Sequence, residues 1–179
     1  LPIRLVPHAP SMSWAVEADR VLVSDGHAFE IRVVKLDGEP DRILRIDSRP
    51  DPMRPEMLEA WVRREAGVPE DAPVGPERMA TYDRVPVPER LPAFDKIIMD
   101  VGANIWARVY PWDTGSEDVW MVFHAAGKAL GYVYAPTGFT AHSIDDESMM
   151  GVWRGALGEE FVFAFQMHGS CTEFLNPPT

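Results

Sequence analysis

The feature that most constrains the fold is a set of short segments in which hydrophobic and polar side chains alternate. Residues 29–33, for example, have the sequence Phe-Glu-Ile-Arg-Val. This two-residue period is typical of a β-strand with one buried face. Asp-Gly dipeptides at 25–26 and 37–38 lie on either side of this segment and supply the positive φ that tight hairpin turns require. We therefore predict antiparallel strands joined by hairpins.

The predicted strands fall into three groups along the chain. They cover 14–16, 20–24, 29–36 and 41–46 in the first group, 96–100, 104–110, 119–124 and 130–134 in the second, and Phe139, 149–154 and 160–167 in the third, where no convincing fourth strand follows. Gly127 and Gly169 lie about 42 residues apart, and Gly38 and Gly127 about 46 once residues 48–90 are set aside. A repeat of this length with four short strands predicts an all-β fold, a partial β-propeller of four-stranded antiparallel blades.

Residues 48–90 form a short helical and irregular insertion between blades of what we otherwise predict to be a single propeller domain over residues 1–179. A helix is predicted within 54–67 because hydrophobic residues recur at helical spacing, with a proline near the start and a glycine past the end. Its hydrophobic side, with Met57 and Trp61, fits two roles equally well: docking a partner protein, or capping a blade. Residues 68–90, rich in Pro, Glu and Asp, are expected to be an irregular connection.

The charge balance excludes several partners. With 17 basic and 28 acidic side chains, the 179-residue chain has a formal net charge of −11. It therefore repels nucleic acid and anionic membrane surfaces, and it has no apolar run of the roughly 20 residues that a membrane helix needs. Cys171 is the single cysteine, so neither an internal disulfide nor a cysteine-based zinc site is expected. The first residue is not Met, which suggests a processed or truncated product.

Three runs carry a resemblance to a known family. They are Asp25-Gly-His-Ala-Phe-Glu-Ile-Arg-Val33, Met99-Asp-Val-Gly-Ala-Asn-Ile-Trp-Ala-Arg108 and Trp120-Met-Val-Phe-His-Ala-Ala-Gly-Lys-Ala-Leu-Gly-Tyr-Val133. This pattern resembles bacterial six-bladed β-propeller proteins of the TolB-like and NHL-like kind, over nearly the whole chain up to Met167. The resemblance implies a binding scaffold with no catalytic role for these motifs, and an exported location, periplasmic or extracellular.

Six blades of about 40 residues need roughly 240 residues, so this chain corresponds to a C-terminal portion of about three blades. An incomplete propeller leaves strand edges open, and open edges invite pairing with other chains. Either further blades belong to a longer reading frame, of which this chain is then a fragment without independent activity, or a second copy completes the ring. We therefore expect possible self-association through open blade edges.

The candidate ligand-binding residues are polar and aromatic. His142, Asp145 and Asp146, with the adjacent Glu147, form a polar loop whose oxygens suit Ca²⁺; the competing interpretation is a solvated turn, because the spacing matches no EF-hand. Trp106 and Trp112 are candidates for a ligand-stacking surface. With the other aromatics they also fit packing between blades; those others are Trp120, Trp153, Phe123, Phe161, Phe163 and Phe165.

Other candidate groups have simpler explanations. Asp100 and Asn104 flank Gly102 and suit either metal ligation at a pore mouth, as in propeller lactonases, or a hairpin turn. His27, His124 and His168 lack the spacing of a zinc site. The chain has neither a Gly-x-Ser-x-Gly elbow nor a glycine-rich phosphate loop.

Two functional hypotheses follow. The first is a non-enzymatic binding or interaction scaffold whose partner, a protein or a small-molecule ligand, is met at the top surface or the open blade edges. The second is the C-terminal half of a metal-assisted propeller hydrolase or lactonase, with further ligands supplied by absent blades. Ca²⁺ is the cofactor that the second hypothesis requires, and the first requires none.

Overall fold

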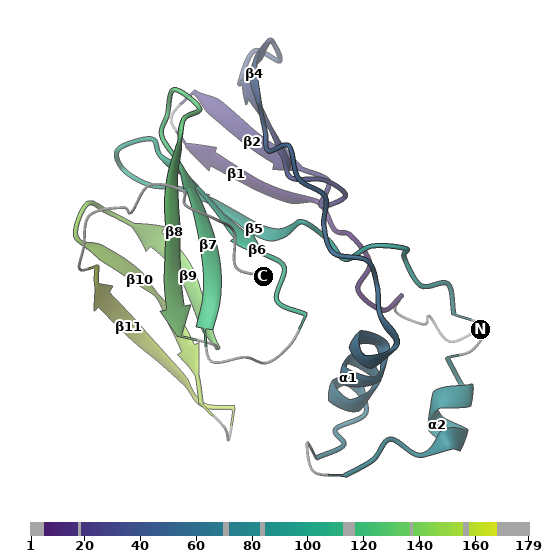
Figure 1. Cartoon of the computed structure of the whole chain (residues 1–179). Coiled ribbons are helices and arrows are strands. Elements are labelled where there is room, and N and C mark those ends of the chain that lie inside the picture. Colours follow the sequence, from purple (N-terminus) through teal and green to yellow (C-terminus); the bar gives the residue numbers. More distant parts are fainter. Residues whose placement is uncertain are drawn as a thin grey trace.

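The protein is built from three antiparallel β-sheets and two short helices (Figure 1). The computed structural model describes residues 6–17, 19–69, 72–82, 85–112, 117–136, 138–155 and 158–167. Each sheet is made of strands that follow one another in the sequence. The prediction of an all-β fold, a partial β-propeller with a short helical insertion, is confirmed.

The first sheet contains β1 (Ser13–Glu17), β2 (Arg20–Ser24), β3 (Glu30–Lys35) and β4 (Pro40–Arg45) in sequence order. All neighbouring strands are antiparallel. Gly26 and Gly38 have φ angles of 75° and 90°. Both glycines therefore occupy the left-handed region that the hairpin prediction required of them.

The second sheet contains β5 (Phe94–Met99), β6 (Ile105–Val109), β7 (Glu117–Phe123) and β8 (Ala129–Pro136), again in sequence order. The third contains β9 (Phe139–Ile144), β10 (Ser148–Arg154) and β11 (Glu160–Gln166), with β10 in the middle. Within the described residues, the third sheet thus has one strand fewer than a four-stranded blade.

The three sheets are arranged radially, because their first strands are neighbours. β5 contacts β1 on one side and β9 on the other. The backbone N–H of Ala93 donates to the carbonyl of Gly26, and that of Val101 donates to the carbonyl of Ile144. From this shared inner edge the sheets fan outward (Figure 1). Faces of successive sheets are thereby packed together, as between propeller blades.

Two hydrophobic cores fill the spaces between the sheets. The second sheet contributes to both cores, because alternate residues of its strands point to opposite faces. The core between the first and second sheets includes Leu22, Ile31, Val33, Leu44, Phe94, Ile97, Ile105, Met121 and Phe123. The core between the second and third includes Ile98, Trp106, Trp120, Val122, Phe139, Ala141, Ile144 and Met149.

The connection between β4 and β5 contains both helices, α1 (Pro55–Glu65) and α2 (Pro76–Ala80). They lie to one side of the sheets (Figure 1). The helix predicted within 54–67 is present as α1. Residues 68–90, expected to be an irregular connection, contain the short helix α2; this helix has five residues, too few for a hydrophobic period to show. Among the described residues, neither helix has the length and apolar character needed to cross a bilayer.

A buried histidine connects the N-terminal segment to the insertion. His8 is 2% exposed, and its ring nitrogens lie 2.9 Å from the Met57 carbonyl oxygen and 2.9 Å from the Tyr110 hydroxyl. A carbonyl accepts only, so Nε2 donates to Met57 and Nδ1 accepts from Tyr110. Burial lowers the pKa of His8, despite the opposing effect of the Met57 hydrogen bond, and this favours the neutral ring.

Candidate functional site

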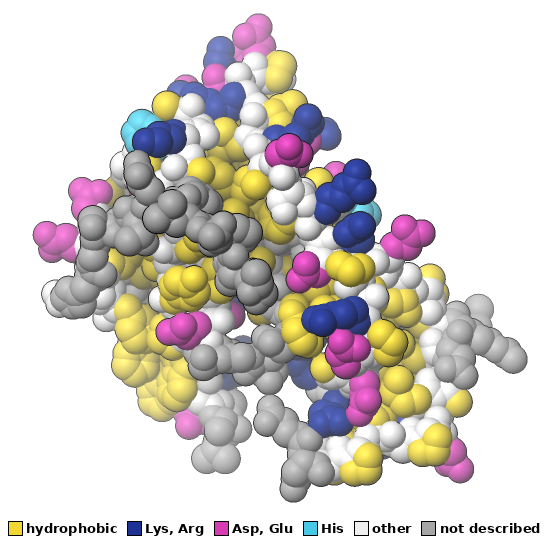
Figure 2. All heavy atoms as spheres, viewed as in Figure 1, with side chains coloured by type: hydrophobic (Ala, Val, Ile, Leu, Met, Phe, Trp, Pro, Cys, Tyr) yellow, Lys and Arg dark blue, Asp and Glu magenta, His cyan; other side chains and the backbone are white. Residues whose placement is uncertain are grey.

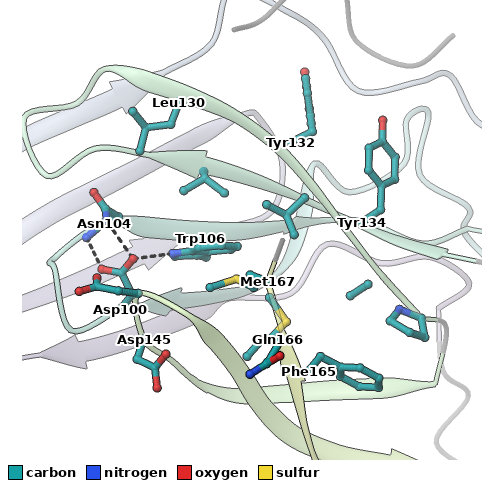
Figure 3. Close-up of a pocket in the computed structure, with 16 residues that line it drawn as sticks. Asp100, Asn104, Trp106, Leu130, Tyr132, Tyr134, Asp145, Phe165, Gln166 and Met167 are labelled. Atoms are coloured by element: carbon teal, nitrogen blue, oxygen red, sulfur yellow. Dashed lines mark hydrogen bonds between the residues drawn. The ribbon is translucent and has the colours of Figure 1, made fainter. Parts of the chain in front are cut away.

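An open cleft of about 610 Å³ lies between the second and third sheets (Figure 3). One wall is the outer strand β8, and the other is formed by the end of β11. The turn between β5 and β6 and the turn between β9 and β10 close one end. The cleft exists because the sheets diverge away from their shared inner edge, so that the outer strands are too far apart to fill the space with side chains.

The walls of the cleft are hydrophobic and aromatic. On β8 they include Leu130, Val133 and Ala135, and on the opposite side Met149, Phe165 and Met167. The rings of Tyr132 and Tyr134 lie at the rim and point away from the cleft (Figure 3). Phe165 is held in place by an edge-to-face contact with Phe139 at a centroid distance of 4.8 Å. These walls suit an apolar or aromatic ligand body.

Asp100 anchors the turn at the polar end of the cleft. Its Oδ1 accepts a hydrogen bond from the backbone N–H of Asn104 at 2.7 Å, and its Oδ2 accepts one from Asn104 Nδ2 at 2.9 Å. Oδ2 also accepts a hydrogen bond from the indole Nε1 of Trp106 at 2.9 Å (Figure 3). The carboxylate is 4% exposed and shared among three donors, so it positions the turn and the Trp106 ring.

Two further carboxylates come from the turn between β9 and β10. Asp145 accepts hydrogen bonds from the backbone N–H groups of Glu147 and Ser148 and from the Ser148 hydroxyl. These bonds lower the pKa of Asp145. Asp146 also lines the cleft and makes no hydrogen bond or ion pair with the described residues.

The structure brings together three of the five residues that the sequence suggested for ligand binding. Trp106, Asp145 and Asp146 all line the cleft. His142 instead lines a separate hollow of about 390 Å³ together with Thr140, Val152 and Arg154. Trp112 lies near the start of α1, where the guanidinium of Arg54 is 5.3 Å from its ring centroid. The roles predicted for these residues stay predictions.

The comparisons with known proteins leave the family open. No family model matches the chain, and no curated protein matches it.

The other candidate residues have defined positions. Met57 and Trp61 of α1 are buried, and Trp61 packs edge-on against Tyr82 at 5.5 Å. His27 and His124 lie in turns, whereas His168 lies outside the described residues. In the described part of the chain, no three His, Cys, Asp or Glu side chains gather in a way that could hold a metal ion.

A buried ionic cluster on the second sheet was not anticipated from the sequence. Arg108 donates to both carboxylate oxygens of Asp95, at 2.8 and 2.6 Å, and to Asp118 at 3.0 Å. Burial raises the pKa of Asp118, while the charge of Arg108 opposes the rise. The three charged residues can be read from the sequence, but the register of β5, β6 and β7 that aligns them required the structure.

Proposed function

We propose that this chain is a non-enzymatic binding scaffold of the β-propeller type, and that its ligand occupies the cleft between the second and third sheets. The observation that carries the proposal is the pairing of hydrophobic walls with the carboxylate of Asp146 at one end, which has no partner among the described residues. Binding sites commonly combine mostly apolar walls with a few polar groups that fix orientation.

The chemistry of the cleft specifies the class of ligand. Phe165 on one wall, and Leu130 and Val133 of β8 on the other, suit an apolar or aromatic body. At the polar end, the carboxylate of Asp145 already accepts hydrogen bonds within its own turn. The charged group of the ligand therefore binds to Asp146. A cation is favoured there, because the chain as a whole carries a net charge of −11. The ligand is therefore an aromatic or aliphatic amine, either a small molecule or a lysine-containing segment of a protein.

The resemblance to TolB-like and NHL-like propellers supports the same proposal. Proteins of that kind are taken to be exported binding scaffolds, and the three runs on which the resemblance rests lie in the first and second sheets. By this resemblance the chain is a three-blade portion of an exported, periplasmic or extracellular propeller.

A matched pair of probes tests the proposed site. Phenethylamine is cationic at neutral pH, and phenethyl alcohol is a neutral molecule of nearly the same shape. Titration followed by NMR of the chain is expected to show tighter binding of the amine, with shifts at the Trp106 indole. Asp146→Asn should weaken amine binding roughly tenfold, since a charge-assisted hydrogen bond contributes about 1.5–3 kcal/mol, and should leave alcohol binding unchanged.

Asp47→Asn is the control, because Asp47 is an exposed carboxylate in the segment after β4, on the first sheet's side of the molecule. It removes the same charge without touching the cleft. The proposal fails if the chain binds both probes equally, or if Asp47→Asn weakens amine binding as much as Asp146→Asn does.

A further inference from the structure

The outer strand of the third sheet has an open edge. The first two sheets each have four strands, but β11 pairs with β10 on one side and with no described strand on the other. Figure 1 shows β11 at the periphery of the molecule. Its open edge extends along seven residues, Glu160–Gln166.

The backbone groups at this edge are set by the pairing with β10. The register is unbroken from Ser148 opposite Gln166 to Arg154 opposite Glu160. Just beyond it, the N–H of Met167 donates to the carbonyl of Glu147 at 2.7 Å. Hydrogen-bonded pairs alternate along an antiparallel ladder, so odd-numbered residues of β11 bond to β10. The even-numbered residues direct their N–H and C=O groups to the open edge; they are Glu160, Val162, Ala164 and Gln166.

The side chains of β11 leave this edge hydrophobic. Phe161, Val162 and Phe163 are 45%, 77% and 42% exposed, and Figure 2 shows hydrophobic surface over this part of the molecule. Natural proteins protect open edges with proline, lysine, a bulge or a very short strand. β11 contains no proline or lysine, is seven residues long and has no bulge against β10. The edge therefore has the properties of a pairing surface.

The strand is also nearly symmetrical about Phe163. In the sequence Glu-Phe-Val-Phe-Ala-Phe-Gln, Phe161 mirrors Phe165, Val162 mirrors Ala164, and Glu160 mirrors Gln166. When two such strands run antiparallel about a two-fold axis at Phe163, each residue meets its mirror position. Hydrophobic residues then meet hydrophobic residues, and no like charges are opposed. A symmetric interface between two identical chains has this self-complementarity, and an unrelated partner does not require it.

We propose that two copies of this chain pair through β11, antiparallel and edge to edge, with the two-fold axis at Phe163. Val162 and the partner's Ala164 form the hydrogen-bonded pairs, which uses the backbone groups that β10 leaves open. Phe163 and the partner's Phe163 meet as a non-hydrogen-bonded pair, the closer kind of contact in an antiparallel ladder. The result is one continuous sheet with three strands from each copy.

This pairing also extends the cleft. Phe161, Phe163 and Phe165 share the face of β11 that points toward the second sheet, because Phe165 packs on Phe139 and stacks with Phe163 at 5.9 Å. In the dimer, the partner's Phe161 lies directly across from Phe165, which lines the cleft. The partner thereby adds an aromatic ring to the cleft wall. The pairing itself does not depend on the proposed ligand.

Sedimentation velocity of the whole chain over a range of concentrations tests the pairing. The wild-type chain should show a monomer–dimer equilibrium. Val162 and Ala164 have exposed side chains and lie opposite each other across the proposed interface. In the double variant V162K/A164K, two pairs of lysines therefore lie opposite each other across the interface, and association should weaken roughly tenfold or more. V162K/A164E opposes unlike charges at the same positions and should still dimerise. A wild-type chain that stays monomeric, or equal association by the two double variants, would overturn the proposal.

Cysteine cross-linking tests the register independently. Only a residue on the two-fold axis lies opposite itself, at a Cα separation of about 4.5 Å that a disulfide can bridge. In a Cys171→Ser background, Phe163→Cys should therefore form a covalent dimer on mild oxidation. Phe161→Cys is the matched control and should not cross-link, because it faces position 165 of the partner. Cross-linking at position 161 as fast as at position 163 contradicts this register.

Discussion

Asp100 Oδ2 and the indole Nε1 of Trp106 lie 2.9 Å apart, in a hydrogen bond that joins a hairpin turn to the core between the second and third sheets. The same carboxylate accepts two hydrogen bonds from Asn104. Asp100 lies in the turn between β5 and β6, and Trp106 lies within β6. The bond therefore fixes the ring that forms the floor of the cleft by means of the turn that closes its end.

Replacing Asp100 is expected to destabilise the protein. Asp100→Ala leaves the Trp106 indole and the Asn104 N–H without their acceptor, and the free energy of unfolding should fall by about 2–3 kcal/mol. Urea denaturation measures the change. Trp106→Phe removes one of the three donors and keeps most of the ring, so its effect should be smaller, about 1 kcal/mol. An equal or larger loss in Trp106→Phe would show that ring volume, and not the hydrogen bond, dominates.

Gly151 should not tolerate a side chain. A Cβ at this position would collide with the Thr140 carbonyl oxygen and the Phe139 ring, at the point where the register between β9 and β10 shifts. Gly151→Ala is expected to lower the free energy of unfolding by about 3 kcal/mol or more. Gly75→Ala has open space around its Cβ and should cost less than about 1 kcal/mol. Similar thermal shifts for the two variants would contradict this packing.

The ionic cluster on the second sheet should be sensitive to loss of its cation. Arg108→Met leaves Asp95 and the 5% exposed Asp118 without a partner, and the free energy of unfolding should fall by about 3 kcal/mol. Lys35→Met breaks an exposed ion pair with Glu39 and should change it by less than about 0.5 kcal/mol. Chemical denaturation of both variants at neutral pH provides the comparison.

His8 should make the stability of the protein depend on pH. Burial lowers the pKa of His8 from its ordinary value of 6.5, and the nearby charge of Arg64 acts in the same direction. The unfolded chain therefore takes up a proton at a higher pH than the folded chain does. The stabilisation that the neutral His8 side chain provides is fully present above pH 6.5, and it is lost as the pH falls toward the pKa of His8 in the folded protein.

Thermal melting at about pH 8 and about pH 5.5 measures this contribution. His8→Gln, which can donate to Met57 and accept from Tyr110 without titrating, should show a smaller drop in Tm between the two values than the wild type. His27→Gln removes an exposed histidine and should keep the wild-type drop. If Tm falls by the same amount in His8→Gln and in the wild type, another group is responsible for the acid sensitivity.

The strands of the first two sheets and the grouping into three were predictable from the sequence because they depend on local patterns, whereas β9 (Phe139–Ile144) was anticipated only at Phe139. Alternation within β3 and the Asp-Gly turns on either side of it specify a hairpin whatever surrounds them. Helix α1 was equally visible, since its hydrophobic residues recur at helical spacing between Pro55 and Gly67. α2 was missed because five residues hold too little periodicity.

The cleft was only partly predictable. Asp145 and Trp106 were recognised as candidates by residue type, but they lie on different sheets, and nothing in the local sequence states that they line one space. His142 was grouped with Asp145 because they are close in sequence. Alternation within β9 sends its side chain to the opposite face of the sheet, toward the second hollow.

The sequence by itself determined which segments of the first two sheets form strands and where the hairpins turn, because alternation and turn residues are local patterns. The tertiary structure alone decided which faces meet. The divergence of the sheets opens the cleft, the register of β5, β6 and β7 brings Asp95, Arg108 and Asp118 together, and the position of β11 leaves its outer edge without a partner among the described strands. Each of these is a contact between segments far apart in the sequence, which local patterns do not encode.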